Sequence, residues 1–149
     1  MLTLLIGCLP GSASTTAVDG NLIVTMWTSS TCVQPGDTVQ LRATVENHGS
    51  QTEIMEVKNK PVLDIFISSP GHPGGYLAHW SDGKSLTSDL THLELKGGES
   101  KTIEMDWVAP SNIEPYGVDA VFTYSDVPPL VVARPGVTVN VGECPGIGP

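Results

Sequence analysis

A strict alternation of apolar and polar residues over positions 38–47 constrains this chain more than any other feature. Apolar side chains occupy every second position of the segment: Val39, Leu41, Ala43 and Val45. Polar residues fill the positions between them. A period of two is typical of an antiparallel strand that buries one face and leaves the other in water. Residues 100–108 repeat the pattern, so at least two half-buried strands are expected.

Apolar segments bounded by turn residues recur along the rest of the chain at intervals typical of a β-sandwich. We expect strands over residues 21–27, 38–47, 62–68, 76–80, 91–95, 100–108, 116–124 and 135–141. The 16 glycines and 12 prolines favour turns over helices, and no apolar stripe of helical period is visible. The sequence therefore predicts an all-β fold: an immunoglobulin-like antiparallel β-sandwich of seven to eight strands over residues 20–144.

The first residues resemble the end of a bacterial lipoprotein signal. Leu5-Ile6-Gly7-Cys8 is similar to a lipobox, which implies cleavage before Cys8 and lipid on its thiol. We expect residues 1–19 to be a remnant lipoprotein signal and flexible tether, and residues 145–149 a short tail. The protein would then be exported to the cell envelope and would contact the membrane only through a lipid anchor. The alternative is a weakly packed N-terminus without export.

The other two cysteines lie at opposite ends of the predicted domain. Cys32 follows the first strand and Cys144 follows the last, and these strands often run side by side in immunoglobulin-like sandwiches. Both residues would then reach the same end of the domain. We therefore predict a Cys32–Cys144 disulfide and an oxidising compartment. Free thiols in a reducing cytoplasm are the alternative.

Charge and motifs exclude several classes of function. The chain has 16 acidic and 7 basic residues, and a net charge of −9 argues against nucleic-acid binding. It lacks the sequence motifs of hydrolases, zinc proteases and phosphate-binding loops, so no enzymatic activity, metal or other cofactor is expected. Asp64 falls inside a predicted strand, where an outward, solvated carboxylate is the ordinary expectation.

The middle of the chain resembles the BsuPI family of intracellular proteinase inhibitors over residues 38–124. The resemblance rests on Val45-Glu46-Asn47-His48-Gly49-Ser50, on residues 62–67 (Val-Leu-Asp-Ile-Phe-Ile), on residues 79–87 (His-Trp-Ser-Asp-Gly-Lys-Ser-Leu-Thr) and on residues 93–100. In that family an aromatic residue and Ser lead into a Lys-containing turn, then a bulky residue and Thr. The matching residues here are Trp80, Ser81, Lys84 and Thr87, while Leu86 stands where the family usually has Phe. The resemblance implies an immunoglobulin-like fold and an inhibitor.

These observations predict a non-enzymatic cell-envelope domain that acts through protein–protein contacts, with proteinase inhibition as the named possibility. Its partner would be a protease or an envelope protein. The alternative is a structural, adhesion or scaffolding module of an envelope lipoprotein. We expect the contacts within residues 69–87, where Pro70 and Pro73 stiffen a loop. The candidate partner-binding residues are His72, Trp80, Ser81, Asp82, Lys84, Leu86 and Thr87. Otherwise Trp80 fills the core and the loop is an ordinary connection.

Overall fold

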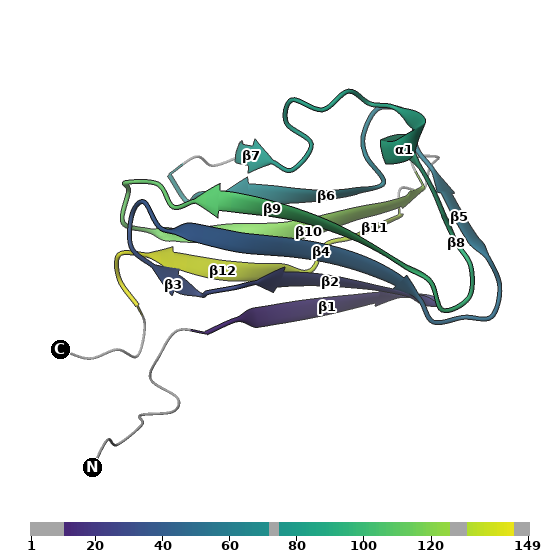
Figure 1. Cartoon of the computed structure of the whole chain (residues 1–149), viewed down its shortest axis with the longest axis horizontal. Coiled ribbons are helices and arrows are strands. Elements are labelled where there is room, and N and C mark those ends of the chain that lie inside the picture. The colour runs from purple at the N-terminus through teal and green to yellow at the C-terminus, as the bar shows by residue number, and fades with distance from the viewer. Residues whose placement is uncertain (1–10, 72–74, 126–130, 145–149) are drawn as a thin grey trace, which may run out of the picture.

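The computed structural model describes residues 11–71, 75–125 and 131–144, which form two packed β-sheets (Figure 1). The helix within these ranges, α1 (Ser88–Thr91), is a single turn. The predicted all-β, immunoglobulin-like sandwich is therefore confirmed. The eight predicted strands correspond to β2, β4, β6, β7, β8, β9, β10 and β12, and the described residues add the strands β1, β3, β5 and β11.

The first sheet has four antiparallel strands in the order β1-β2-β4-β9. They are β1 (Ala13–Asp19), β2 (Leu22–Thr28), β4 (Thr38–Asn47) and β9 (Ser100–Val108). Within the described chain, β9 pairs with β4 on one side, so its other side is an open edge of this sheet.

The second sheet is built around β10 (Pro115–Ser125), which pairs antiparallel with β12 (Gly136–Val141) along one side and with β6 (Leu63–Ser68) along the other. Beyond β12 lies the short β3 (Cys32–Val33), and beyond β6 lies β7 (Tyr76–His79). The strand β11 (Val131–Ala133) pairs with the end of β10. The edge formed by β6 and β7 lies on the same side of the molecule as β9 (Figure 1).

A two-stranded ribbon extends from one end of the sandwich (Figure 1). It pairs β5 (Glu53–Glu56) with β8 (His92–Leu95) and meets the second sheet through the Ser125–Glu56 bridge. Asn47 fastens the base of the ribbon, because its buried amide nitrogen donates to Gln51 O at 2.8 Å and to Leu95 O at 3.0 Å.

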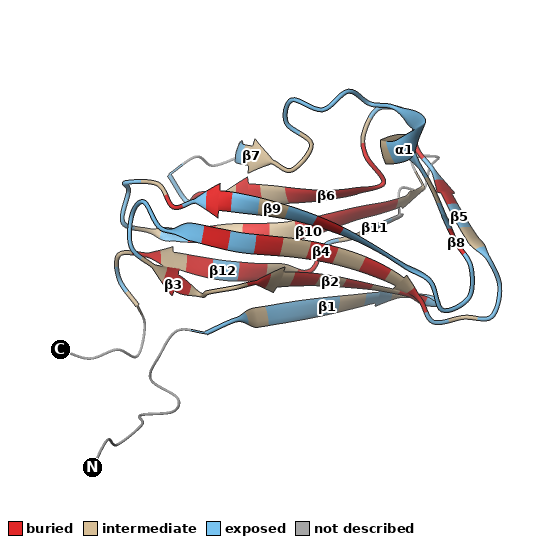
Figure 2. Ribbon diagram, viewed as in Figure 1, coloured by how far each residue is buried: buried red, intermediate tan, exposed pale blue. Residues whose placement is uncertain are grey.

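The core lies between the two sheets and follows the alternation read from the sequence. The four apolar residues of β4 named above are fully buried, and the polar residues between them are intermediate or exposed (Figure 2). The second sheet contributes Ile65, Ile67, Val118 and Phe122, all without exposed surface. Burial of such side chains is the main favourable term in folding, so this packing fixes the relative position of the sheets.

Tyr116 adds a polar contact at one end of this core. Its ring packs edge-on against Trp107 with centroids 5.2 Å apart, and its hydroxyl donates to Asn112 O at 3.3 Å. A buried tyrosine whose hydroxyl bonds to the backbone a few residues upstream is a hallmark of immunoglobulin-like sandwiches.

The tether predicted over residues 1–19 is wrong for its last part. Residues 13–19 form β1, which pairs along its whole length with β2 through a two-residue turn at Gly20 and Asn21. Gly20 has φ +59°, as the first central position of such a turn requires. The backbone ladder orders this segment although none of its residues is buried. Residues 1–10, with the lipidation site predicted at Cys8, and the tail 145–149 lie outside the described residues.

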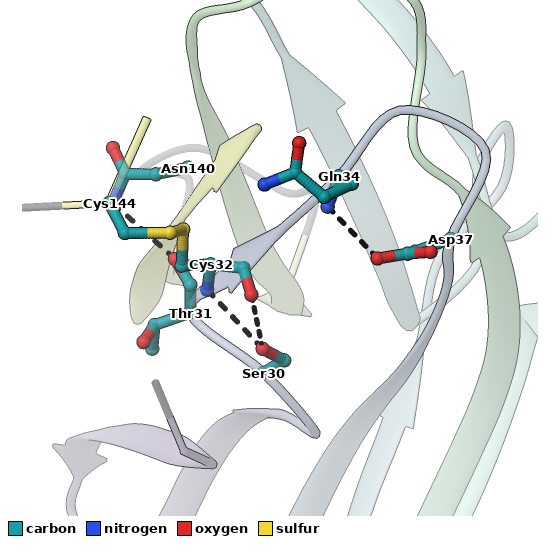
Figure 3. Close-up of a disulfide and its surroundings, with 7 residues drawn as sticks. All are labelled: Ser30, Thr31, Cys32, Gln34, Asp37, Asn140 and Cys144. Carbon is teal, nitrogen blue, oxygen red and sulfur yellow. Dashed lines mark hydrogen bonds between the residues drawn. A yellow bond between two sulfur atoms is a disulfide. The ribbon is translucent and has the colours of Figure 1, made fainter. Parts of the chain in front are cut away.

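The structure joins Cys32 and Cys144 in a disulfide with Cα atoms 5.5 Å apart (Figure 3). The parallel pairing of β3 with β12 brings these residues together, and Asn140 N donates to Thr31 O at 2.8 Å beside the bond. Ser30 Oγ holds the backbone of Cys32 by donating to its carbonyl at 2.8 Å. Formation of this bond in the protein in solution stays a prediction.

If the disulfide forms, neither cysteine will react with an alkylating reagent in denatured, unreduced protein. Reduction should lower the free energy of unfolding by about 4–5 kcal/mol, because the bond closes a very long loop and restricts the unfolded chain. Intact mass after alkylation, with and without reductant, and urea unfolding measure both effects. Full alkylation of both residues without reductant would show that the bond is absent.

Candidate functional site

Most of the residues predicted to contact a partner lie in one turn at the end of β7, residues 79–84, which we call the anchored turn. Asp82 N donates to His79 O at 3.1 Å, and Asp82 Oδ2 accepts from His79 N at 2.8 Å. Lys84 N then donates to Ser81 O at 3.0 Å, and Gly83 has φ +75°. The turn is therefore closed by its own backbone, and Asp82 has a structural role within it.

Trp80 anchors this turn across the open edge of the sandwich. Its backbone N–H donates to Ile65 O at 2.9 Å in the second sheet, and its indole N–H donates to Glu104 O at 3.1 Å in the first. The ring also packs against the core, and Lys84 Nζ lies 4.8 Å from the ring centre. Trp80 thus links β6 and β9, and the alternative interpretation of Trp80 as a core residue is partly right.

Asp64 provides a second anchor. Ser81 Oγ donates to Asp64 Oδ2 at 2.5 Å, while the backbone N–H groups of Ser81 and Ile65 donate to Asp64 Oδ1 at 3.1 and 2.8 Å. Asp64 is only 3% exposed, so the expectation of a solvated carboxylate is wrong. The reason is that the turn after β7 folds back over β6 and covers it. Burial raises the pKa of Asp64, and its hydrogen bonds with Ser81 and Ile65 oppose this shift.

The anchored turn leads into eight consecutive exposed residues, 82–89, which we call the exposed loop. It contains four of the predicted contact residues: Asp82, Lys84, Leu86 and Thr87. The loop ends at α1, where Thr87 O accepts from Leu90 N at 3.0 Å and Thr91 N at 3.1 Å. Val62 N then donates to Leu90 O at 2.8 Å and fixes α1 to the chain just before β6. Both ends of the exposed loop are therefore fixed to the sandwich.

A cluster on the outer face of the second sheet holds β7 in place, and single-sequence reasoning missed it. The Phe66 and His79 rings stack with centroids 4.1 Å apart, and Tyr76 packs against both. Arg134 hydrogen-bonds to Tyr76 and donates to Asp119 Oδ2 at 3.0 Å. These residues come from four strands or their ends, so no local pattern could have joined them. A shallow hollow of about 570 Å³ lies beside Tyr76 and Arg134.

Neither His72 nor the centre of the 69–75 loop can be placed, because residues 72–74 lie outside the described ranges. Across the described residues, no group of three metal-ligating side chains lies close together. The helical part of the described chain also offers no segment long and apolar enough to span a membrane.

The pKa of Asp64 gives a test of its anchoring environment. A raised folded pKa means that the folded protein binds the proton more tightly than the unfolded chain. The resulting stabilisation is present below the ordinary value of 3.8 and is lost as pH rises through the folded value. Asp64→Asn keeps an acceptor for the two N–H donors and does not titrate. We therefore expect the parent to lose stability relative to Asp64→Asn as pH rises from about 3 to 7. Urea unfolding at each pH measures the difference, and a parent that gains relative stability with pH would contradict the assignment.

Solved structures with a similar fold include Spo0M, a sporulation control protein from Bacillus subtilis. It has 11% identity and a TM-score of 0.54, and the match covers 85% of this chain and 51% of that chain. The C-terminal domain of wzt has 9% identity and a TM-score of 0.49, with 91% and 75% covered. A cycloisomaltooligosaccharide glucanotransferase from Paenibacillus sp. has 15% identity and a TM-score of 0.49, with 80% and 14% covered. The likeness to Spo0M shows the fold alone. No curated protein sequence matches the chain.

A family model matches residues 26–126, which include β4, β6, β9, β10, the turn after β7 and the exposed loop. The family is BsuPI, described as intracellular proteinase inhibitor. That description contradicts the exported, lipid-anchored localisation predicted from Leu5-Ile6-Gly7-Cys8, so that prediction is wrong. Its basis was a very short apolar run before one cysteine, which is a weak signal for a lipoprotein. Because the match covers more than half of the sequence, the chain belongs to the BsuPI family of intracellular proteinase inhibitors.

Proposed function

We propose that this protein inhibits a proteinase by direct contact, and that the exposed loop, residues 82–89, forms the centre of the contact surface. The family to which the chain belongs is one of proteinase inhibitors, which are not enzymes. The observation that carries the proposal is a run of eight exposed residues whose two ends are both hydrogen-bonded to the sandwich.

The fixed ends of the exposed loop reduce the conformational entropy that is lost on binding. An inhibitor must present a segment that fits an active-site cleft, and ordering a flexible segment on binding reduces affinity. Here Trp80 and Ser81 hold the loop before it leaves the sandwich, and Leu90 holds it on return. Little conformational freedom remains to be lost, so the loop can bind with small changes of shape.

The position of the loop also suits this role. It stands at the edge formed by β6, β7 and β9, away from the β1 edge of the sandwich (Figure 1). A cleft in a partner can therefore receive the loop without displacing a strand. The described part of the 69–75 loop lies at the other end of β7 and is not needed for this contact.

Residual-activity assays with the full chain test the proposal. The chain is titrated against a panel of serine, cysteine and metallo-endopeptidases, and the variants Lys84→Glu and Lys96→Glu are compared with it. Both variants make the same charge change at an exposed lysine, but Lys96 lies in the β8–β9 turn, outside the exposed loop. We expect inhibition of at least one protease, weakened about tenfold or more by Lys84→Glu and unchanged by Lys96→Glu.

Thermal unfolding of both variants serves as the control for folding. Equal inhibition by the two variants would place the contact surface elsewhere. A parent chain that inhibits none of the proteases would contradict the proposed function itself.

A further inference from the structure

We propose that Leu86 is the residue that enters the primary specificity pocket of the protease, and that the target is therefore an endopeptidase whose pocket is apolar. This inference rests on the proposed function and specifies its partner. The primary pocket of a protease selects one side chain by size and charge, as the apolar slot of chymotrypsin and the acidic pocket of trypsin do.

The first support is the chemistry of the exposed loop. Its sequence is Asp-Gly-Lys-Ser-Leu-Thr-Ser-Asp, so Leu86 is its one large apolar residue. Leu86 is 48% exposed although it follows directly on a well-anchored turn. The side chain therefore has apolar surface available to bury in a partner, which is the usual source of binding energy at the centre of an interface.

The second support is the backbone at Leu86. Thr87 N donates to Ser85 O at 2.9 Å, which makes Leu86 the central residue of a three-residue turn. Among the described non-glycine residues none has positive φ, so the turn is of the common inverse type. Leu86 consequently stands at the apex of this three-residue turn, from which its half-exposed side chain can project into a cleft.

The third support is that the backbone is fixed close to Leu86 on both sides. Lys84 N is bonded to Ser81 O, and Thr87 O accepts from two backbone N–H groups of α1. The position of the apex is therefore set by hydrogen bonds that lie within two residues of it. Such fixing allows one side chain to be presented in a constant geometry.

Lys84 is the competing residue, because a lysine would suit an acidic pocket. Its ammonium group already lies 4.8 Å from the centre of the Trp80 ring, and its backbone closes the turn with Ser81. Insertion of Lys84 into a pocket would break the cation–π contact. Leu86 is half-exposed and carries no charge to hold in such a contact, and this difference favours an apolar pocket over an acidic one.

The test compares the parent with Leu86→Ala and Leu86→Lys against chymotrypsin and trypsin. We expect the parent to inhibit chymotrypsin, and Leu86→Ala to raise the inhibition constant about ten- to a hundredfold, as removal of a buried leucine side chain predicts. Leu86→Lys should lose inhibition of chymotrypsin and gain inhibition of trypsin. The matched controls are Val18→Ala and Val18→Lys on β1, where Val18 is 68% exposed, and they should behave as the parent.

Two results overturn the inference while leaving the proposed function intact. One is that Leu86→Ala inhibits a protease as strongly as the parent does, while Leu86→Lys gains no inhibition of trypsin. The other is parental inhibition of trypsin that Lys84→Ala abolishes, which would assign the pocket to Lys84. Absence of inhibition by the parent across the wider protease panel would instead overturn the proposed function. Intact mass after incubation confirms that the chain acts as an inhibitor and is not consumed as a substrate.

Discussion

The packing of two alternating strand faces positions everything else in this protein. The inward residues of β4 and β9 lie against those of β6 and β10, and the residues at the centre of this contact have no exposed surface. A side-chain period of two allows no small adjustment, because a shift of one residue would turn every apolar side chain of a strand towards water. The register of the paired strands in each sheet is therefore fixed. As a result, β9 and β6 lie on the same side of the molecule.

That shared edge allows the exposed loop to be anchored to both sheets. Trp80 can contact both sheets only because the carbonyl of Glu104 on β9 lies within 3.1 Å of its indole nitrogen. Asp64 is buried beneath the same turn and satisfies two backbone N–H groups and one hydroxyl. A charged group buried without partners would strongly destabilise the fold, so these bonds tie the loop to the integrity of β6. The position of the proposed inhibitory surface therefore depends on the packing of the core strands beneath it.

Sequence reasoning was successful where the physical signal is local. The alternation over residues 38–47 predicts a strand with the same bounds as β4, because one face of the strand contacts the core and the other contacts water. The residues from Trp80 to Thr87 could be grouped because they are adjacent in the chain. The roles of Asp64, Tyr76 and Arg134 depend on partners brought near by tertiary pairing, which one sequence does not reveal. β1 was missed because an edge strand with mostly exposed side chains is held by its backbone ladder, and its composition resembles that of a linker.

Amide hydrogen exchange of the free protein tests the central claim that the exposed loop is fixed before it meets a partner. The backbone N–H groups of Ser81, Lys84 and Leu90 all donate hydrogen bonds at the two ends of the loop. We expect these amides to exchange far more slowly than those of an unstructured chain, although residues 82–89 are exposed. Exchange of all three at the unprotected rate, in a protein whose β4 and β10 amides remain protected, would show a flexible loop and contradict the account.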